Sequence, residues 1–130
     1  MKKAVATICS WKKRADPDQM PASQLYLGRH IAQVENIAGT QKADYYILSG
    51  RFGLLHSTQE LHHYDYRLPD DEAVIEDLAR KVGIQMTNFG ITELDFYVEA
   101  SDGWKPYISA MQKAAEGAGV EINLFELGDI

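Results

Sequence analysis

A β-strand is predicted by the stretch Lys3-Ala4-Val5-Ala6-Thr7-Ile8-Cys9, which is short, apolar and rich in residues that favour strands. Three later runs of the same kind occupy residues 45–49, 94–99 and 120–125. Each run is long enough for one strand and too short for a helix that packs on its own. The chain is therefore expected to contain four strands.

Apolar residues recur at helical spacing between these runs, over residues 27–38, 74–82 and 104–115. Gly39 is expected to end the first of these helices. Strands that alternate with helices require right-handed crossovers, which place the strands parallel and cover both faces of the sheet. The predicted fold is α/β, a three-layer α/β/α domain with a four-stranded, mostly parallel, Rossmann-like sheet.

Length and composition favour one domain over residues 1–130, since 45% of the residues are apolar and 25% are charged. The single cysteine cannot form an internal disulfide, and no apolar run approaches the roughly 20 residues that span a bilayer. No signal peptide is recognised either. We expect a cytoplasmic protein without membrane contact.

The net charge of −6 argues against a protein that grips duplex DNA through its phosphates. Any contact with nucleic acid would have to use a local basic patch. Nucleic acid is therefore a possible partner that the overall charge disfavours.

Two long loops, at residues 10–21 and 50–69, each follow a predicted strand. In open α/β sheets, ligands lie beyond the carboxyl ends of the strands, and long loops in compact domains often carry function. Both loops are expected to lie over the same edge of the sheet.

The first loop places Ser10 before Lys12, Lys13 and Arg14. A hydroxyl and several cations directly after a strand suit a phosphate group, with the cations supplying charge and Ser10 a hydrogen bond. A solvated basic turn explains the same residues. No glycine pattern of a nucleoside triphosphatase accompanies them.

The second loop begins with Ser49-Gly50-Arg51-Phe52-Gly53. Gly50 and Gly53 permit close approach of the backbone to a ligand, and Arg51 could bind an anion. A tight turn needs the same glycines, so a structural role is the alternative.

Further along the second loop, Tyr64-Asp65-Tyr66 combines aromatic faces that stack on bases with a carboxylate that could stabilise a developing cation. The alternative is that both tyrosines pack under the loop while Asp65 caps local backbone. The neighbouring His62 and His63 lack a distant partner ligand, so neither a metal nor another cofactor is expected.

After the third strand, Glu99 and Ser101 should emerge at the same sheet edge. A carboxylate in that place is a candidate acid, base or nucleophile. Cys9 at the end of the first strand is expected to be a buried structural thiol rather than a nucleophile.

The run Ser49-Gly50-Arg51-Phe52-Gly53-Leu54-Leu55 resembles the Ser-(Gly/Ala)-x-(Tyr/Phe)-Gly-Leu-Leu motif of the YaaA peroxide-stress proteins and their short bacterial and phage relatives. The resemblance extends to Cys9-Ser10 with Lys12 or Lys13, to Pro21-Ala22-Ser23-Gln24-Leu25-Tyr26 and to Tyr64-Asp65, although His63 stands where the family usually has proline. It implies an α/β core and a shared pocket. The pocket residues are Ser10, Lys12, Tyr26, Ser49, Gly50, Arg51, Gly53, Tyr64 and Asp65.

With 130 residues, the chain has no room for the helical insertion that is associated with DNA binding in the longer YaaA proteins. The resemblance therefore implies the core and the pocket rather than DNA binding. By analogy, the motifs of the short relatives are similar to those of enzymes that act on N-glycosidic bonds.

The leading hypothesis is a small enzyme that handles nucleotides or modified bases, such as an N-glycosidase or a glycosyl-transfer enzyme. Lys12, Lys13 and Arg51 would hold phosphate, Tyr26 and Tyr64 would bracket the base or sugar, and Asp65 or Glu99 would act in catalysis. The expected partner is a nucleotide or nucleoside-type small molecule.

Two other functions remain open. One is a non-enzymatic stress-response module that binds nucleic acid through Lys12, Lys13, Arg14 and Arg51. The other is a subunit or inhibitor whose aromatic loop at residues 64–67 docks on a protein partner.

Overall fold

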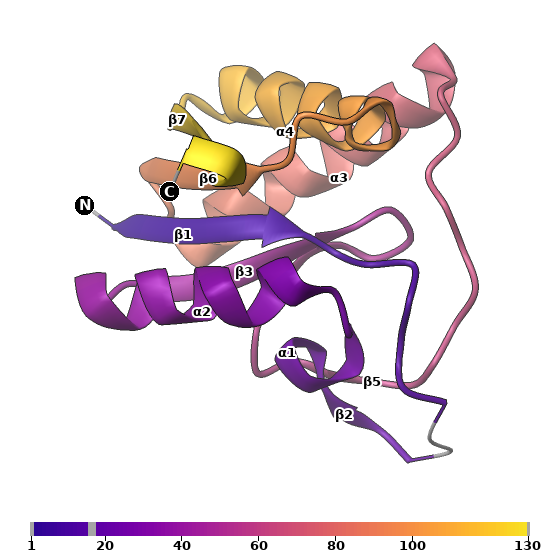
Figure 1. The fold of residues 1–130 in the computed structure, drawn as a ribbon. Coiled ribbons are helices and arrows are strands. Elements are labelled where there is room, and N and C mark those ends of the chain that lie inside the picture. The colour runs from indigo at the N-terminus through magenta and orange to yellow at the C-terminus, as the bar shows by residue number, and fades with distance from the viewer. Residues whose placement is uncertain (1, 16–17, 130) are drawn as a thin grey trace.

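The computed structural model describes residues 2–15 and 18–129, so residues 16 and 17 of the first long loop, Pro17 included, lie outside the described part. Within that part, the chain forms a mixed α/β fold with a five-stranded, mostly parallel sheet and four α-helices (Figure 1). The strands of the main sheet are β1 (Lys3–Ile8), β3 (Asp44–Ser49), β4 (Gly53–His56), β6 (Glu93–Val98) and β7 (Glu121–Glu126). The helices are α1 (Ala22–Leu25), α2 (Arg29–Gln41), α3 (Glu72–Phe89) and α4 (Lys105–Ala118).

The strand order in the main sheet is β4-β3-β1-β6-β7, with β1 at the centre. β1 pairs in parallel with β3 and β6, and β6 pairs in parallel with β7. These are the four strands that the sequence predicts. The prediction of only four strands was wrong, because Gly53–His56 turns back and pairs antiparallel with β3 as an edge strand.

Two shorter strands, β2 (Met20–Pro21) and β5 (Glu60–Leu61), pair antiparallel in a small separate sheet. They tie the two long loops to each other. The first loop is also fixed on α1, because Arg14 N donates to Leu25 O and Leu27 N donates to Lys12 O, both at 2.9 Å.

Helix ends follow local chemistry. The Asp71 carboxylate caps α3 by accepting from the backbone N–H groups of Ala73 and Val74. The expectation that Gly39 ends α2 was wrong, because the helix continues to Gln41 and Lys42 takes the left-handed conformation with φ 55°. The carbonyls at the end of the helix are satisfied there without a glycine.

Alternate residues of β1 face two apolar cores, as the two-residue period of a strand requires. Ala4, Ala6 and Ile8 pack in one core with residues of α3 and α4. Val5 lies in the other core with residues of α1 and α2, such as Leu25. Figure 1 shows α2 and the pair α3 and α4 on opposite sides of β1.

Parallel pairing brings the carboxyl ends of β1, β3 and β6 to one edge, where the residues that follow each strand lie close together. Cys9 N, for example, donates to Leu48 O at 2.9 Å. Among the helices described, none combines the length and apolar character needed to cross a membrane.

Candidate ligand-binding site

A pocket of about 330 Å³ lies beyond the carboxyl ends of β1 and β6. It is called the strand-edge pocket below. Its lining residues come from four parts of the fold: the end of β1, the first turn of α2, the loop before α3, and the segment from β6 to α4. They are Ile8, Cys9, Ser10, Trp11, His30, Tyr66, Arg67, Glu99, Ser101, Gly103, Trp104 and Tyr107.

His30 is a buried base in this pocket, with 7% of its surface exposed. Its Nε2 atom lies 2.6 Å from the carbonyl oxygen of Ile8. A carbonyl only accepts, so Nε2 carries the proton and Nδ1 of the neutral ring is an acceptor. Burial lowers the pKa of His30, whereas the bond to Ile8 and the charge of Glu99 act in the opposite direction. His30 is therefore neutral near pH 7.

Because Gly28 has no side chain, the His30 ring can occupy the space beside it. A Cβ atom at Gly28 would lie 2.6 Å from His30 Cε1 and 2.9 Å from Ser10 Cβ. Gly28 also precedes α2 directly, and its N–H donates to Ser10 Oγ at 3.1 Å. The absence of a side chain here allows the start of α2, Ser10 and His30 to pack together at the pocket wall.

Among the residues that the structure describes, Glu99 is the only carboxylate that lines the strand-edge pocket. It is exposed and follows β6, and Ser101 lies two residues further on. The pocket also holds the Arg67 guanidinium, whose Cζ lies 5.1 Å from the centroid of the Trp11 ring. An acid, a neutral imidazole, a cation and aromatic faces thus line one cavity.

Cys9 is also a lining residue of the strand-edge pocket. Burial raises its pKa, so the thiol stays protonated at neutral pH. This environment is that of an inert structural cysteine.

Beside the pocket, three buried hydroxyl groups form a chain. Tyr64 Oη lies 2.8 Å from Ser49 Oγ and is also hydrogen-bonded to Tyr26 Oη. Ser49 Oγ accepts from the N–H groups of Arg51 and Phe52, so its own proton is free for Tyr64. Burial raises the pKa of Tyr64 to about 12 and that of Tyr26 further, so both phenols remain neutral.

Lys13 belongs to the same buried region, and only 8% of it is exposed. Its Nζ lies 4.6 Å from the Tyr64 ring centroid and donates to Trp11 O at 3.2 Å. Burial lowers the pKa of Lys13. Lys13 is thus enclosed by aromatic rings, unlike its exposed neighbour Lys12, and is poorly placed to hold the phosphate that the sequence suggested.

The structure brings together only some of the site residues that the sequence predicts. Ser10, Glu99 and Ser101 line the strand-edge pocket, and Lys13, Tyr26, Ser49 and Tyr64 form the buried cluster beside it. Asp65 lines neither this pocket nor the second one described below. Its carboxylate is 74% exposed and lies 3.9 Å from His63 Nε2. Asp65 and Glu99 therefore do not line the same cavity.

Gly50 and Gly53 have structural explanations. A Cβ atom at Gly50 would lie 3.2 Å from the Tyr66 ring and 3.3 Å from the Tyr107 ring, so the glycine permits close packing. Gly53 has φ +82° and lies against Gln85, whose Oε1 accepts from Leu54 N at 2.7 Å. Gly53 begins β4 and is not part of the pocket lining.

Arg51 and Tyr64 line a second pocket of about 540 Å³, which lies against β4 and the segment around β5. Phe52, His62 and His63 line it too. No group of three or more His, Cys, Asp or Glu side chains that could hold a metal ion occurs in the part of the chain that the structure describes.

Sequence reasoning missed His30 and Trp104 as pocket residues, and it placed Arg67 in a loop at the functional edge without naming it as a site residue. His30 falls in the first turn of a helix and belongs to no motif, and its significance depends on its contact with Ile8. Arg67 and Trp104 lie within two or three residues of predicted candidates, Asp65 and Ser101. Only the folded structure shows which residue of each loop lines the cavity.

The chain also matches a known protein family. The model of a family of unknown function, DUF6884, matches residues 5–128. The chain belongs to the DUF6884 family. The match covers every residue that lines the strand-edge pocket. No curated protein and no solved structure matches the chain.

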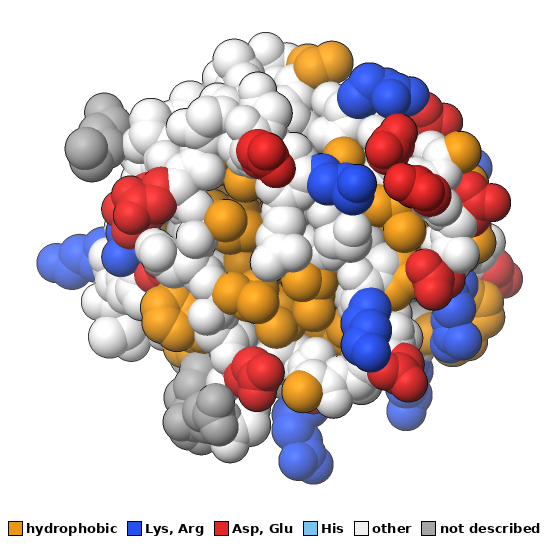
Figure 2. All heavy atoms as spheres, turned by 90° about the horizontal axis from the view of Figure 1, so that it is seen from above, with side chains coloured by type: hydrophobic (Ala, Val, Ile, Leu, Met, Phe, Trp, Pro, Cys, Tyr) orange, Lys and Arg blue, Asp and Glu red, His pale blue; other side chains and the backbone are white. Residues whose placement is uncertain are grey.

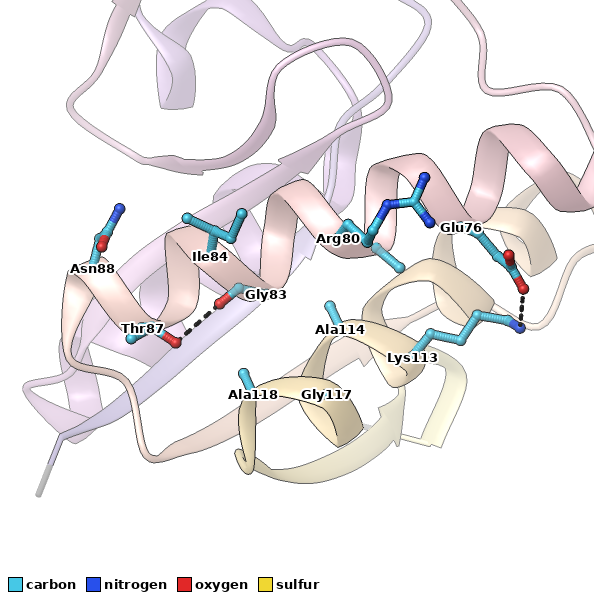
Figure 3. A pocket seen from close by; sticks show the side chains of 11 residues that line it. Glu76, Arg80, Gly83, Ile84, Thr87, Asn88, Lys113, Ala114, Gly117 and Ala118 are labelled. Carbon is cyan, nitrogen blue, oxygen red and sulfur yellow. Dashed lines mark hydrogen bonds and ion pairs between the residues drawn. The ribbon is translucent and has the colours of Figure 1, made fainter.

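A further cavity, of about 610 Å³, is a groove between α3 and α4 (Figure 3). Its charged side chains form ion pairs. Glu76 pairs with Lys113 across the groove at 3.8 Å, and Arg80 pairs with Asp77, which is not a lining residue. Thr87 donates to the carbonyl of Gly83. Seen from above, hydrophobic side chains are exposed among the charged ones on this face (Figure 2). The groove lacks convergent polar groups that would orient a substrate.

Proposed function

We propose that this DUF6884 protein is a small enzyme that binds a nucleotide or a modified nucleoside in the strand-edge pocket and hydrolyses its N-glycosidic bond. The observation that carries the proposal is the placement of Glu99 in one cavity with His30, Arg67 and several aromatic rings. Pockets that bind small molecules usually measure about 300 to 1,000 Å³, and this one lies within that range.

The lining suits the three parts of a nucleotide. Trp11, Tyr66 and Trp104 offer aromatic faces for a base. Arg67 offers a cation for a phosphate, and the hydroxyls of Ser10 and Ser101 offer hydrogen bonds to a sugar or a phosphate.

The proposed chemistry is the addition of water to the anomeric carbon. The bond from that carbon to the base nitrogen breaks, its electron pair stays with the base, and the base takes up a proton. Glu99 is the carboxylate that stabilises the cationic sugar in the transition state or takes the proton of the attacking water. We assign this role to Glu99 rather than to Asp65, because Asp65 lies outside the pocket lining.

His30 supports binding through its neutral ring. With Nε2 held by Ile8, the ring keeps one orientation and one tautomer at neutral pH. Its edge-on contact with Trp104, at 4.8 Å between ring centroids, orders one aromatic wall of the pocket.

Three other inferences accompany the proposal. The resemblance of Ser49–Leu55 to the YaaA motif supports a nucleotide-handling role, since Ser49 anchors the turn beside the pocket. The two cores on opposite faces of β1 support a three-layer, Rossmann-like α/β/α architecture. The single cysteine supports a cytoplasmic location.

A panel of ribo- and deoxyribonucleoside monophosphates and modified nucleosides tests the proposal. Release of free base, separated by liquid chromatography, together with a ligand-induced rise in the unfolding temperature, is the expected result. No release and no thermal shift with any member of the panel would reject it.

A further inference from the structure

Six side chains at the sheet edge form a continuous series in which cations and aromatic rings alternate. In spatial order they are Arg67, Trp11, Lys13, Tyr64, Arg51 and Phe52, and they are called the cation–aromatic ladder below. Each consecutive pair in this order consists of one cation and one ring. The distances between the cationic atom and the ring centroid are 5.1, 5.2, 4.6, 5.9 and 5.3 Å for the five successive pairs. All five lie within the usual range of about 6 Å for an attractive cation–π contact.

The ladder joins the two pockets of this edge. Arg67 and Trp11 line the strand-edge pocket. Tyr64, Arg51 and Phe52 line the second pocket beside β4. The ladder therefore extends from residues that line the strand-edge pocket to residues that line the second pocket.

Exposure is greatest at the two ends of the ladder. Trp11 is 56% exposed and Phe52 is 37% exposed, and Arg51 and Arg67 are exposed as well. Lys13 and Tyr64 in the middle are buried and connect the two exposed ends. Exposed rings flanked by guanidinium groups offer faces for stacking and charges for phosphates.

We propose that the ladder binds single-stranded nucleic acid and that the nucleotide in the strand-edge pocket belongs to such a strand. Unpaired bases stack on Trp11 and Phe52, and Arg51 and Arg67 neutralise the phosphates between them. This inference rests on the proposed function, since it names the substrate class of the same pocket. A free nucleotide would occupy the strand-edge pocket alone and would not use the exposed Arg51 and Phe52, which line the second pocket.

The arrangement favours a single strand over a duplex. Aromatic side chains stack on bases only when the bases are unpaired. The net charge of −6 opposes broad contact with a duplex, whereas a narrow strip of exposed arginines and rings needs only local positive charge.

Fluorescence anisotropy with a labelled oligothymidylate of about ten nucleotides tests the ladder. The variants are Trp11→Leu and Phe52→Leu, singly and together, and Arg51→Gln. Phe125→Leu is the matched control, because Phe125 is 41% exposed and lies outside the ladder, stacked on Tyr97. Each aromatic ladder variant should weaken binding about tenfold, as expected for the loss of one stacked base, and the control should bind as the natural protein does.

Tryptophan emission supplies a second readout, since the chain has two tryptophans, Trp11 and Trp104. Stacking on Trp11 should quench emission when the oligonucleotide binds, and Trp11→Leu should remove that part of the quenching. Unfolding curves of each variant confirm that the fold is intact. A variant that fails to fold is replaced by Trp11→Tyr, which keeps a ring and should retain most of the binding.

The outcomes separate the two proposals. If thymidine monophosphate binds as tightly as the oligonucleotide, or if a duplex of the same length binds more tightly, the ladder proposal is overturned and the pocket proposal stands. If the oligonucleotide binds through the ladder but no base is released from any substrate, the proposed hydrolysis fails and the ladder stands.

Discussion

His30 Nε2 lies 2.6 Å from the carbonyl oxygen of Ile8, so the first turn of α2 is hydrogen-bonded to the last residue of β1. This contact places a buried, neutral imidazole beside the end of the central strand. It also orients the ring that borders Trp104 and the strand-edge pocket. The same histidine therefore contributes to the stability of the fold and to the wall of the pocket.

The stability of the protein should fall as the pH drops through the range in which an unfolded histidine takes up a proton. Burial lowers the pKa of His30 below its ordinary value of 6.5, so the unfolded chain binds a proton there that the folded chain does not. The contribution is fully present above pH 6.5 and is lost as the pH falls toward the lowered pKa.

Urea unfolding at about pH 7.5 and about pH 5.5 measures this effect. The natural protein should lose more unfolding free energy between the two conditions than His30→Gln does. His56→Gln, at a half-buried histidine outside the pocket, is the control and should behave as the natural protein. An equal loss in the natural protein and in His30→Gln would contradict the assignment of this pH dependence to His30.

Removing the Tyr64 hydroxyl should cost about 1 to 2 kcal/mol of unfolding free energy, because it leaves the buried hydroxyls of Ser49 and Tyr26 short of a partner. Tyr64→Phe, Tyr26→Phe and the double variant form a cycle that chemical denaturation measures. The two costs should not add, since both variants break the same hydrogen bond. Strict additivity would show that the two hydroxyls act independently.

Gly28→Ala should weaken ligand binding in the strand-edge pocket. Gly28 has φ −61°, which alanine adopts without strain, so the effect arises from the new Cβ atom 2.6 Å from His30 Cε1. Gly39→Ala, near the other end of α2, is the control, because a Cβ atom there meets nothing within 4 Å. Calorimetry with a ligand from the nucleotide panel should show lower affinity for Gly28→Ala and unchanged affinity for Gly39→Ala. The reverse order would show that His30 does not shape the pocket.

Periodicity predicted the regular elements well, because β1, β3, β6 and β7 are apolar runs separated by amphipathic helices. It missed β4, which begins at the positive-φ glycine Gly53 and, with four residues, carries too short a pattern. It also missed α1, a single turn of helix, which is shorter than the period that would reveal it.

The site was predictable only where a strand end fixed it. Ser10 and Glu99 follow β1 and β6 within two residues, so topology alone places them at the pocket. Loop residues have no such constraint. Backbone hydrogen bonds join this loop to the end of α1 and to the segment after it. They fix the loop so that Lys12 faces solvent and Lys13 is buried. For the same reason, the sequence placed Arg67 at the functional edge but did not show that it, rather than Asp65, lines the pocket.

The assignment of the reacting carboxylate leads to the most direct test of the proposed function. Glu99→Gln keeps the size of the side chain and removes its charge, and Asp65→Asn does the same to a carboxylate outside the pocket lining. The measurement is the rate of base release from the substrate that the panel identifies, with the thermal shift by that substrate recorded for each variant.

Glu99→Gln should lower the rate at least about a hundredfold while the thermal shift persists, and Asp65→Asn should release base at the natural rate. A Glu99→Gln variant that binds the substrate and releases base at the natural rate would contradict the account.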